Sequence, residues 1–314
     1  MNLIDQYDLD GAYLRVRQHA QRTPILTSTS LDELTDASLF FKCENFQRSG
    51  SFKFRGACNS VFALSDADAA RGVATHSSGN HGAALALAAR IRGITCTVVV
   101  PTAANARKVE AIERYGARLE RCEPTLAARE ATLARVIDAT AAIEVHPYDA
   151  VLTIAGQSTC ARELLEDEPL LDALIAPIGG GGLWAGSALV GKRHNPNLKM
   201  FAAEPAAAAD AFLGFQRGSR VTEHPINTIA DGLRTYVGVR NFEVLNEYAS
   251  AVLLASEAEI IAAMRLIFER LKIIVEPSCA VPLATILRYP EHFRGKRVGV
   301  ILTGGNVDLD QLPW

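Results

Sequence analysis

The sequence predicts an α/β fold in which parallel sheets are flanked by helices. Short apolar runs rich in β-branched residues alternate along the chain with longer alanine-rich or amphipathic stretches. Strands buried on both faces of a sheet have this continuous apolar character, and helices that connect parallel strands explain the alternation. No internal repeat or low-complexity linker interrupts the pattern.

Each predicted element rests on its own local pattern. Six apolar runs bounded by Gly, Pro or polar residues are the predicted strands: Leu39–Phe41, Gly72–Thr75, Thr95–Val100, Leu174–Ile178, Met200–Ala203 and Val298–Leu302. Four periodic stretches are the predicted helices: His81–Arg92, Arg107–Tyr115, Leu126–Thr140 and Glu257–Leu271. Gly93 and Gly116 follow two of these helices, where glycine commonly ends a helix.

Composition and charge narrow the class of protein. The 314 residues are 49% apolar and 21% charged, which is enough to bury one or two substantial cores. A net charge of −3 and the lack of a dense Lys/Arg block argue against nucleic acid or a membrane as partner, so we expect a small molecule. Asp5, Asp8 and Asp10 interrupt the first apolar stretch, which predicts a cytoplasmic location without a secretory leader.

The six cysteines predict neither a metal site nor a disulfide framework. They lie far apart and form no C-x-x-C pair, which argues against structural zinc, and disulfides are rare in cytoplasmic chains of this size. We therefore expect buried thiols at Cys43, Cys58, Cys96, Cys122, Cys160 and Cys279.

One lysine has the surroundings that imine chemistry requires. Lys53 stands between Phe52 and Phe54 near the start of a predicted helix. Desolvation between two aromatic rings would lower the pKa of its amine, as an imine-forming lysine needs. Taken alone, this segment fits a surface lysine with a buried stem equally well or better.

Three polar or glycine-rich segments follow predicted strands. Gly179-Gly180-Gly181-Gly182 lies between a predicted strand and an apolar helix-like run, where backbone N–H groups could bind a phosphate. It matches neither the nucleoside-triphosphate loop nor the dinucleotide motif, so a phosphomonoester is favoured. Ser77-Ser78-Gly79-Asn80-His81-Gly82 could bind a carboxylate, although Asn80 could equally be a helix cap. Thr303-Gly304-Gly305-Asn306 follows the last strand.

Together these segments resemble the fold type II pyridoxal-phosphate enzymes, of the serine/threonine dehydratase and serine racemase family. The resemblance covers nearly the whole chain and rests on seven pieces in one order: Gly50-Ser51-Phe52-Lys53, His76 to Gly82, Ile154-Ala155-Gly156-Gln157, the four glycines, Thr228-Ile229-Ala230-Asp231-Gly232, Glu276-Pro277-Ser278, and Gly304-Gly305-Asn306-Val307-Asp308. It implies a two-domain fold, similar to the tryptophan synthase β subunit, with a large cofactor-binding domain (1–71 and 148–314), a small mobile substrate-binding domain (72–147), and a homodimer.

The resemblance also implies roles for individual residues. Lys53 would bind pyridoxal 5'-phosphate covalently and act as the base that removes the Cα proton. The cofactor-binding residues would be Phe52, Lys53, Asn80, Gly179, Gly180, Gly181, Gly182, Glu276 and Thr303, and the substrate-binding residues Ser77, Ser78, Asn80, His81 and Arg129. Glu204, the Ala208 carbonyl and Asp210 would bind Mg²⁺ or Ca²⁺, a hard cation suited to oxygen ligands.

The implied reaction is removal of water from a 3-hydroxy amino acid to give a 2-oxo acid and ammonia. The alternative is an amino-acid racemase, in which Lys53 and Ser78 exchange the Cα proton on opposite faces. Serine and threonine are possible substrates of the dehydratase, and serine is the expected substrate of the racemase. Ala83, Ser158 and Tyr148 depart from the family's usual residues, so 3-phenylserine and 3-hydroxyaspartate are further candidates. A catalytically silent ligand-binding protein and a cysteine synthase-like enzyme are weaker readings, since Lys53 is present and the best motif matches lie elsewhere.

Overall fold

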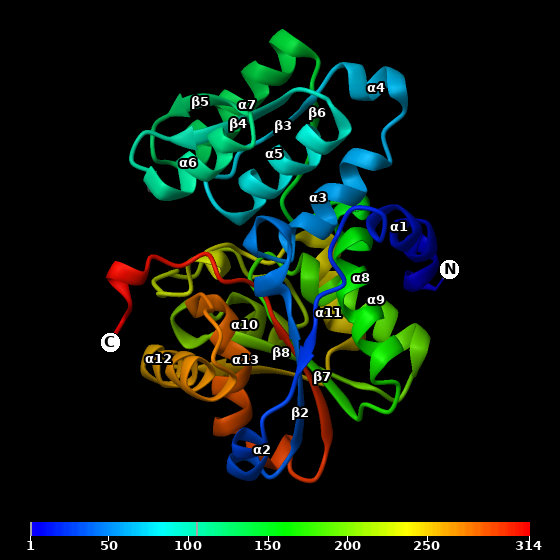
Figure 1. Cartoon of the computed structure of the whole chain (residues 1–314), viewed down its shortest axis with the longest axis vertical. Coiled ribbons are helices and arrows are strands. Elements are labelled where there is room, and N and C mark those ends of the chain that lie inside the picture. Colours follow the sequence, from blue (N-terminus) through cyan, green and yellow to red (C-terminus); the bar gives the residue numbers. More distant parts are fainter. Residues whose placement is uncertain (1, 105) are drawn as a thin grey trace.

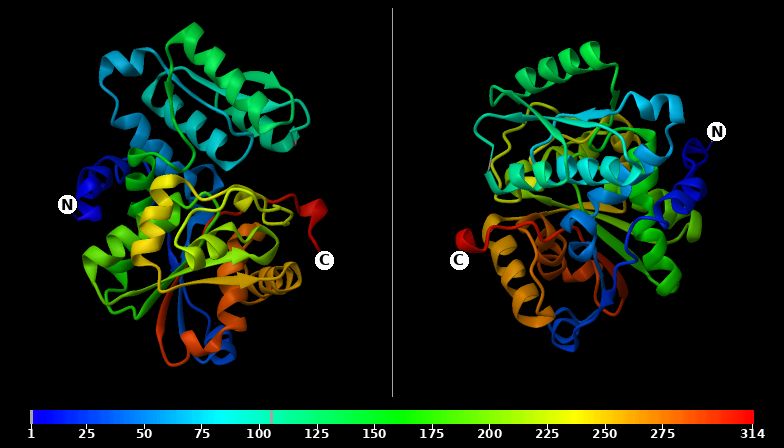
Figure 2. Two further views of the ribbon diagram at one scale, coloured as in Figure 1. Left: turned by 180° about the vertical axis from the view of Figure 1, so that it is seen from behind. Right: turned by 45° about the horizontal axis from the view of Figure 1, so that its top comes forward.

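The computed structural model describes residues 2–104 and 106–314. Two sheets dominate it, each flanked by helices, and the four-stranded sheet with its helices lies to one side of the six-stranded sheet (Figure 1). Both further views show the same arrangement, with the two chain termini on opposite sides of the molecule (Figure 2). The predicted α/β class is therefore confirmed.

The larger sheet has six strands in the order β1-β2-β10-β7-β8-β9. All neighbours are parallel except β1 and β2, which pair through Ile25 with Lys42 and Leu26 with Phe41. The strands are β1 (Ile25–Leu26), β2 (Ser38–Cys43), β7 (Ala173–Pro177), β8 (Lys199–Pro205), β9 (Ala251–Ala255) and β10 (Arg297–Leu302). Every residue of β7 is buried, as expected for a strand with helices on both faces.

Two hydrophobic clusters cover the two faces of this sheet. One face packs on α2 (Thr29–Thr35), α12 (Glu257–Leu266) and α13 (Pro277–Arg288). The other face packs mainly on α1 (Leu9–Val16), α8 (Val151–Asp167), α9 (Gly182–His194), α10 (Asp210–Arg217) and α11 (Val239–Tyr248). At the centre of the second cluster, the buried Trp184 indole donates to the Phe201 carbonyl at 2.9 Å. The sheet is therefore covered on both sides.

The smaller sheet has four parallel strands in the order β5-β4-β3-β6. The strands are β3 (Val73–Thr75), β4 (Cys96–Pro101), β5 (Arg118–Cys122) and β6 (Ile143–Glu144). One face packs on α3 (Lys53–Phe62), α5 (Asn80–Arg92) and α6 (Ala106–Arg114), and the other on α7 (Leu126–Thr140). The short α4 (Asp66–Ala70) precedes β3.

The predicted elements are all present, with shifted ends. Gly93 ends α5 in a left-handed conformation with φ +75°, as predicted. The helix predicted at Glu257–Leu271 begins at Glu257, where Ser256 and Glu259 form a capping box, but its last turn, Ile267–Leu271, is a π-helix. All six cysteines are free and buried, as expected. No helix among the described residues is long and apolar enough to cross a membrane.

Candidate active site

The predicted site residues meet at one cavity of about 610 Å³. The cavity lies where loops after the carboxyl ends of β3, β7 and β10 converge with the start of α3, as is usual for ligand sites in open parallel sheets. Every residue predicted to bind cofactor or substrate lines it: Phe52, Lys53, Ser77, Ser78, Asn80, His81, Arg129, Gly179, Gly180, Gly181, Gly182, Glu276 and Thr303. The residues predicted to bind a cation do not line it.

Lys53 is the first residue of α3, and its amine is held inside the site. Its Nζ donates to the Pro147 carbonyl at 2.9 Å and lies 5.2 Å from the centre of the Phe52 ring. Burial lowers the pKa of this amine to about 8, against the opposing effect of the Glu276 carboxylate. A substantial fraction is therefore neutral near pH 8, as a nucleophile or proton acceptor must be.

Asn80 binds other side chains and does not cap its own helix. Its Nδ2 donates to both oxygens of Glu276, at 2.9 and 3.1 Å, and its Oδ1 accepts from Asn306 Nδ2 at 2.9 Å. Asn306 also donates to the Ser49 carbonyl at 2.8 Å. The chain of contacts joins the start of α5 to the loops after β10 and before α3.

The four glycines form a tight turn between β7 and α9. Gly181 has φ +90°, a conformation that favours glycine. A Cβ on Gly180 would lie 2.3 Å from Tyr148 Cγ, so no side chain fits there unless the Tyr148 ring moves. Asn241 Nδ2 fixes the turn by donating to the carbonyls of Gly180, at 2.6 Å, and Tyr148, at 3.0 Å. The turn presents the amino-terminal N–H groups of α9 as a binding site for an anion.

The histidines of the site are neutral near pH 7. Burial lowers the pKa of His81 to about 3 and that of His146 to about 4. His81 Nε2 lies 3.0 Å from the Val145 carbonyl. Because a carbonyl only accepts, Nε2 carries the proton, and Nδ1, which is buried and has no partner, offers a lone pair. His81 can therefore accept a proton or hydrogen bond at Nδ1 and cannot donate one to a carboxylate there.

Arg129, a cation, and His76, which is neutral near pH 7, form a wall of the cavity with two unpaired buried nitrogen atoms. Arg129 lies on α7, and its Nε is buried without a hydrogen-bond partner. His76 Nδ1 is also buried and unpaired. The pKa of His76 is lowered by burial and then by the nearby Arg129 charge, so the two side chains are close. Unpaired buried donors beside a cavity indicate that a ligand atom satisfies them.

The residues fit pyridoxal phosphate. Lys53 supplies an amine of lowered pKa, and the glycine turn at a helix amino terminus suits a phosphate. Thr303 Oγ1 is buried without a partner, as expected of a hydroxyl that would bind a ring nitrogen. Ser77 and Ser78 line the same cavity from the loop between β3 and α5.

Some lining residues were not predicted as site residues from the sequence. In the sequence, Tyr148 was notable only because it departs from the family's usual residue. In the structure, its hydroxyl is 2.9 Å from Thr235 Oγ1 and its ring lies against the glycine turn. Gln157, His146 and Arg234 also line the cavity. Arg234 and Thr235 lie two and three residues after Gly232, where a matched segment ends, and this nearness in sequence was the available signal.

The predicted cation ligands lie outside the cavity. The Glu204 oxygens accept from Ala211 N at 2.8 Å and Phe212 N at 2.9 Å, and Asp210 Oδ2 accepts from Val237 N at 2.9 Å. Burial raises the pKa of Asp210 to about 6, and burial with the Asp210 charge raises that of Glu204 well above its usual range. No group of three or more His, Cys, Asp or Glu side chains suited to a metal occurs in the described part of the chain.

Known proteins resemble this chain over its whole length. A family model described as "Pyridoxal-phosphate dependent enzyme" matches residues 16–304. A beta-hydroxyaspartate dehydratase of Paracoccus denitrificans is 51% identical over 98% of both chains. The crystal structure of serine racemase from Dictyostelium discoideum has a TM-score of 0.93 at 45% identity and covers 98% of this chain and 99% of its own. A pyridoxal 5'-phosphate-dependent aspartate racemase has a TM-score of 0.92 at 35% identity, covering 98% and 97%.

The family match spans Lys53, the glycine turn and Thr303, which are the residues whose geometry fits the cofactor. The chain therefore belongs to the pyridoxal-phosphate-dependent enzymes of fold type II, together with the serine racemases and the hydroxy-amino-acid dehydratases.

Proposed function

We propose that this enzyme is an ammonia-lyase that removes water from a 3-hydroxy amino acid and releases a 2-oxo acid and ammonia. The single observation that carries the proposal is the Lys53 amine, which is buried, has a pKa of about 8 and lines the same cavity as the glycine turn and Thr303. The 51% identical relative is named as a dehydratase of this class.

The chain's own residues bind, orient and move protons. Pyridoxal phosphate, when bound, supplies the electron sink that makes the substrate Cα–H bond acidic. Gly179 to Gly182 and the start of α9 would hold its phosphate, Thr303 would bind its ring nitrogen, and Phe52 would pack beside it. Lys53 Nζ takes the Cα proton, and the Pro147 carbonyl orients that amine at 2.9 Å. Loss of the β-hydroxyl as water leaves an enamine, which tautomerises and hydrolyses to the 2-oxo acid.

Among the candidate substrates we favour 3-hydroxyaspartate. The α-carboxylate would bind at Ser77, Ser78 and the amino terminus of α5. Arg129 and His76 offer unpaired buried nitrogen atoms on another wall of the cavity. A second carboxylate would satisfy the buried Nε of Arg129, whereas the methyl of threonine or the phenyl ring of 3-phenylserine would leave that nitrogen unpaired. The similar proteins named as hydroxyaspartate dehydratase and aspartate racemase support an acidic substrate.

A racemase activity is the second candidate. Ser78 and Lys53 line the same cavity from different elements, the loop before α5 and the start of α3. If their side chains reach Cα from opposite faces, one can remove the proton and the other can return one. The serine racemase of Dictyostelium discoideum, at 45% identity, supports this reading.

We propose Mg²⁺ or Ca²⁺ at Glu204, Asp210 and the Ala208 carbonyl. Burial raises the pKa of both carboxyl groups and the Asp210 charge raises that of Glu204 further, and a bound divalent cation would favour the ionised form of both. The ion would be structural or activating, since it lies outside the cavity. The mobility of residues 72–147, the homodimer and the cytoplasmic location stay predictions from the sequence.

A substrate panel tests the proposal. The enzyme loaded with pyridoxal phosphate is incubated with L-serine, L-threonine, 3-hydroxyaspartate and 3-phenylserine, and both 2-oxo acid release and the enantiomers of remaining substrate are measured. We expect fastest oxo-acid release from 3-hydroxyaspartate. Enantiomer exchange with little oxo acid would instead establish a racemase and refute the lyase assignment.

A further inference from the structure

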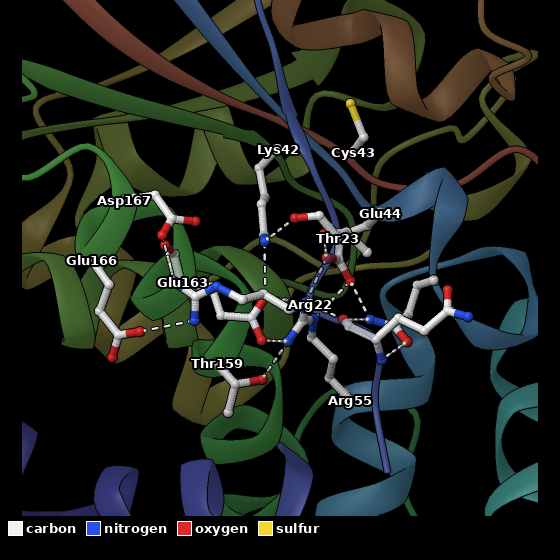
Figure 3. Close-up of polar contacts among 12 residues, drawn as sticks. Arg22, Thr23, Lys42, Cys43, Glu44, Arg55, Thr159, Glu163, Glu166 and Asp167 are labelled. Atoms are coloured by element: carbon white, nitrogen blue, oxygen red, sulfur yellow. Dashed lines mark hydrogen bonds and ion pairs between the residues drawn. The ribbon is translucent and has the colours of Figure 1, made fainter. Parts of the chain in front are cut away.

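Four ionisable side chains are buried together beneath the start of α3. This buried ion cluster consists of Lys42, Glu44, Arg55 and Glu163, and Figure 3 shows their side chains pointing toward one another. Lys42, Glu44 and Arg55 have no exposed surface, and Glu163 is 3% exposed. The two cations balance the two carboxylates. None of the four lines the cavity.

Arg55 is the centre of the cluster. Its Nε and Nη2 donate to the two oxygens of Glu44 at 2.7 and 2.8 Å, and its Nη1 and Nη2 donate to the two oxygens of Glu163 at 2.8 and 2.7 Å. Nη1 also donates to Thr159 Oγ1 at 3.2 Å. All five N–H bonds of the guanidinium therefore have an acceptor: four form two fork-like pairs that a lysine could not form, and the fifth bonds to Thr159.

The remaining members tie the cluster to the six-stranded sheet. Lys42 Nζ donates to Glu163 at 2.8 Å and to the Thr23 carbonyl at 2.7 Å. Thr23 Oγ1 donates to Glu44 at 2.6 Å. The members come from β2, the turn after it, α3 and α8, so Arg55 connects α3 to three other parts of the chain.

The position of Arg55 on α3 is unusual for a cation. It lies in the first turn of the helix, where the helix dipole disfavours positive charge. Replacing a buried ion network by apolar side chains is often neutral or stabilising, so stability alone is a weak explanation for it. Lys53 is two residues earlier on the same turn. The cluster fixes the backbone from which the Lys53 side chain extends.

We propose that Arg55 is a positioning residue, which holds the first turn of α3 against β2 and α8 so that the Lys53 amine stays in place in the active site. The proposal rests on the proposed role of Lys53. The far part of α3 packs on α5, which belongs to the smaller sheet. The buried ion cluster therefore holds the Lys53 amine in place relative to the larger sheet. The glycine turn and Thr303 follow strands of the same sheet.

The test is the Arg55→Lys variant, which keeps the positive charge and loses the paired hydrogen bonds to Glu44 and Glu163. The full-length chain is stripped of cofactor and mixed with pyridoxal phosphate, and the rate at which the visible absorbance band appears is measured against pH. In the unaltered enzyme this rate should rise through the pKa of Lys53, at about 8. Arg55 is not among the charges that shift that pKa, so a change in the variant reports a change in the position or burial of the amine.

In Arg55→Lys we expect the pKa of the Lys53 amine to rise by about one unit. The neutral fraction of this amine at pH 8 then falls from about one half to about one tenth, and pyridoxal phosphate is bound about fivefold more slowly. In the loaded variant, kcat should fall about tenfold with KM within threefold. Arg265→Lys is the matched control, because Arg265 pairs with Glu269 at the surface of α12, outside the buried ion cluster. In this control, the pH dependence of cofactor binding and kcat should both be unchanged.

A second control separates positioning from stability. Ile260→Ala removes a buried side chain of α12, far from α3, and should lower the melting temperature without moving the pH profile. If Arg55→Lys does not fold, Glu163→Gln takes its place, with the same expected shift. An unchanged profile and an unchanged kcat in the folded variant would refute the proposal. Failure of the Lys53 assignment is recognised separately, because Lys53→Ala would then still form the absorbance band.

Discussion

Arg129 gives the sharpest test of the substrate assignment. In Arg129→Met, the methionine fills most of the space of the arginine's apolar stem, but the positive charge beside His76 is lost. If the guanidinium binds the second carboxylate of 3-hydroxyaspartate, the variant loses its charge-assisted hydrogen bonds, worth about 1.5–3 kcal/mol each. Two such bonds predict a loss of about 3 kcal/mol or more, which is at least about 150-fold in kcat/KM.

L-Serine is the internal comparison, because it has no second carboxylate. Its kcat/KM should change less than about threefold, so the ratio of the two substrates should fall by about two orders of magnitude. Arg135→Met is the matched control, since Arg135 lies on the same helix, does not line the cavity, and within the described part of the chain hydrogen-bonds Thr132 Oγ1 alone. The assay follows 2-oxo acid release at several substrate concentrations.

Two results would refute the reasoning. Equal losses with both substrates would show that Arg129 supports the fold or the cofactor and does not select the substrate. No loss with 3-hydroxyaspartate would show that the second carboxylate, if it is recognised at all, binds elsewhere in the cavity. The unpaired Nε of Arg129 would then need another partner.

Three further outcomes follow from the site. Lys53→Ala should abolish both the visible absorbance of bound cofactor and the release of 2-oxo acid, and an unchanged spectrum would contradict its assignment. Ser78→Ala should abolish enantiomer exchange while lyase activity stays within threefold; equal loss of both would make Ser78 a substrate-binding residue only. Asp210→Asn should stabilise the cation-free enzyme by about 2–3 kcal/mol at pH 7.5 and by about half as much at pH 5, measured by denaturant unfolding in chelator. Because the pKa of this carboxyl is raised to about 6 in the folded state, it begins to destabilise the fold above its unfolded pKa of about 3.9 and does so fully above about 6. Added Mg²⁺ should stabilise the unaltered enzyme and not this variant, and activity unaffected by exhaustive chelation would contradict an activating ion.

The sequence predicted the central buried strands well and did not predict several other elements, among them the mostly buried β9 and the exposed edge strand β5. The strands of the sheet centres are continuous apolar runs, so β7 and β10 were predictable to within one residue. β5, with the sequence Arg-Leu-Glu-Arg-Cys, is an edge strand with mostly exposed side chains and carries no such signal. The π-helical turn at Ile267–Leu271 also escaped prediction, because its periodicity differs too little from that of an α-helix over five residues.

For the site, motifs predicted which residues meet and could not predict what each one contacts. The segments around Lys53, Asn80 and Thr303 were expected to converge, and they line one cavity. The protonation of His81 depends on a carbonyl 64 residues away, at Val145, which no local pattern reveals. The pairing of Arg55 with Glu44 and Glu163 likewise depends on three-dimensional packing.

The contact between Tyr148 and Gly180 has a consequence for engineering the substrate range of this enzyme. The tyrosine ring occupies the space that any side chain at position 180 would need. A smaller residue at position 148 alone would widen the pocket but leave a void against the glycine turn. A larger residue at position 180 alone would displace the Tyr148 ring. Libraries that vary one position at a time would therefore discard both changes, and a new specificity at this wall is best sought by randomising positions 148 and 180 together.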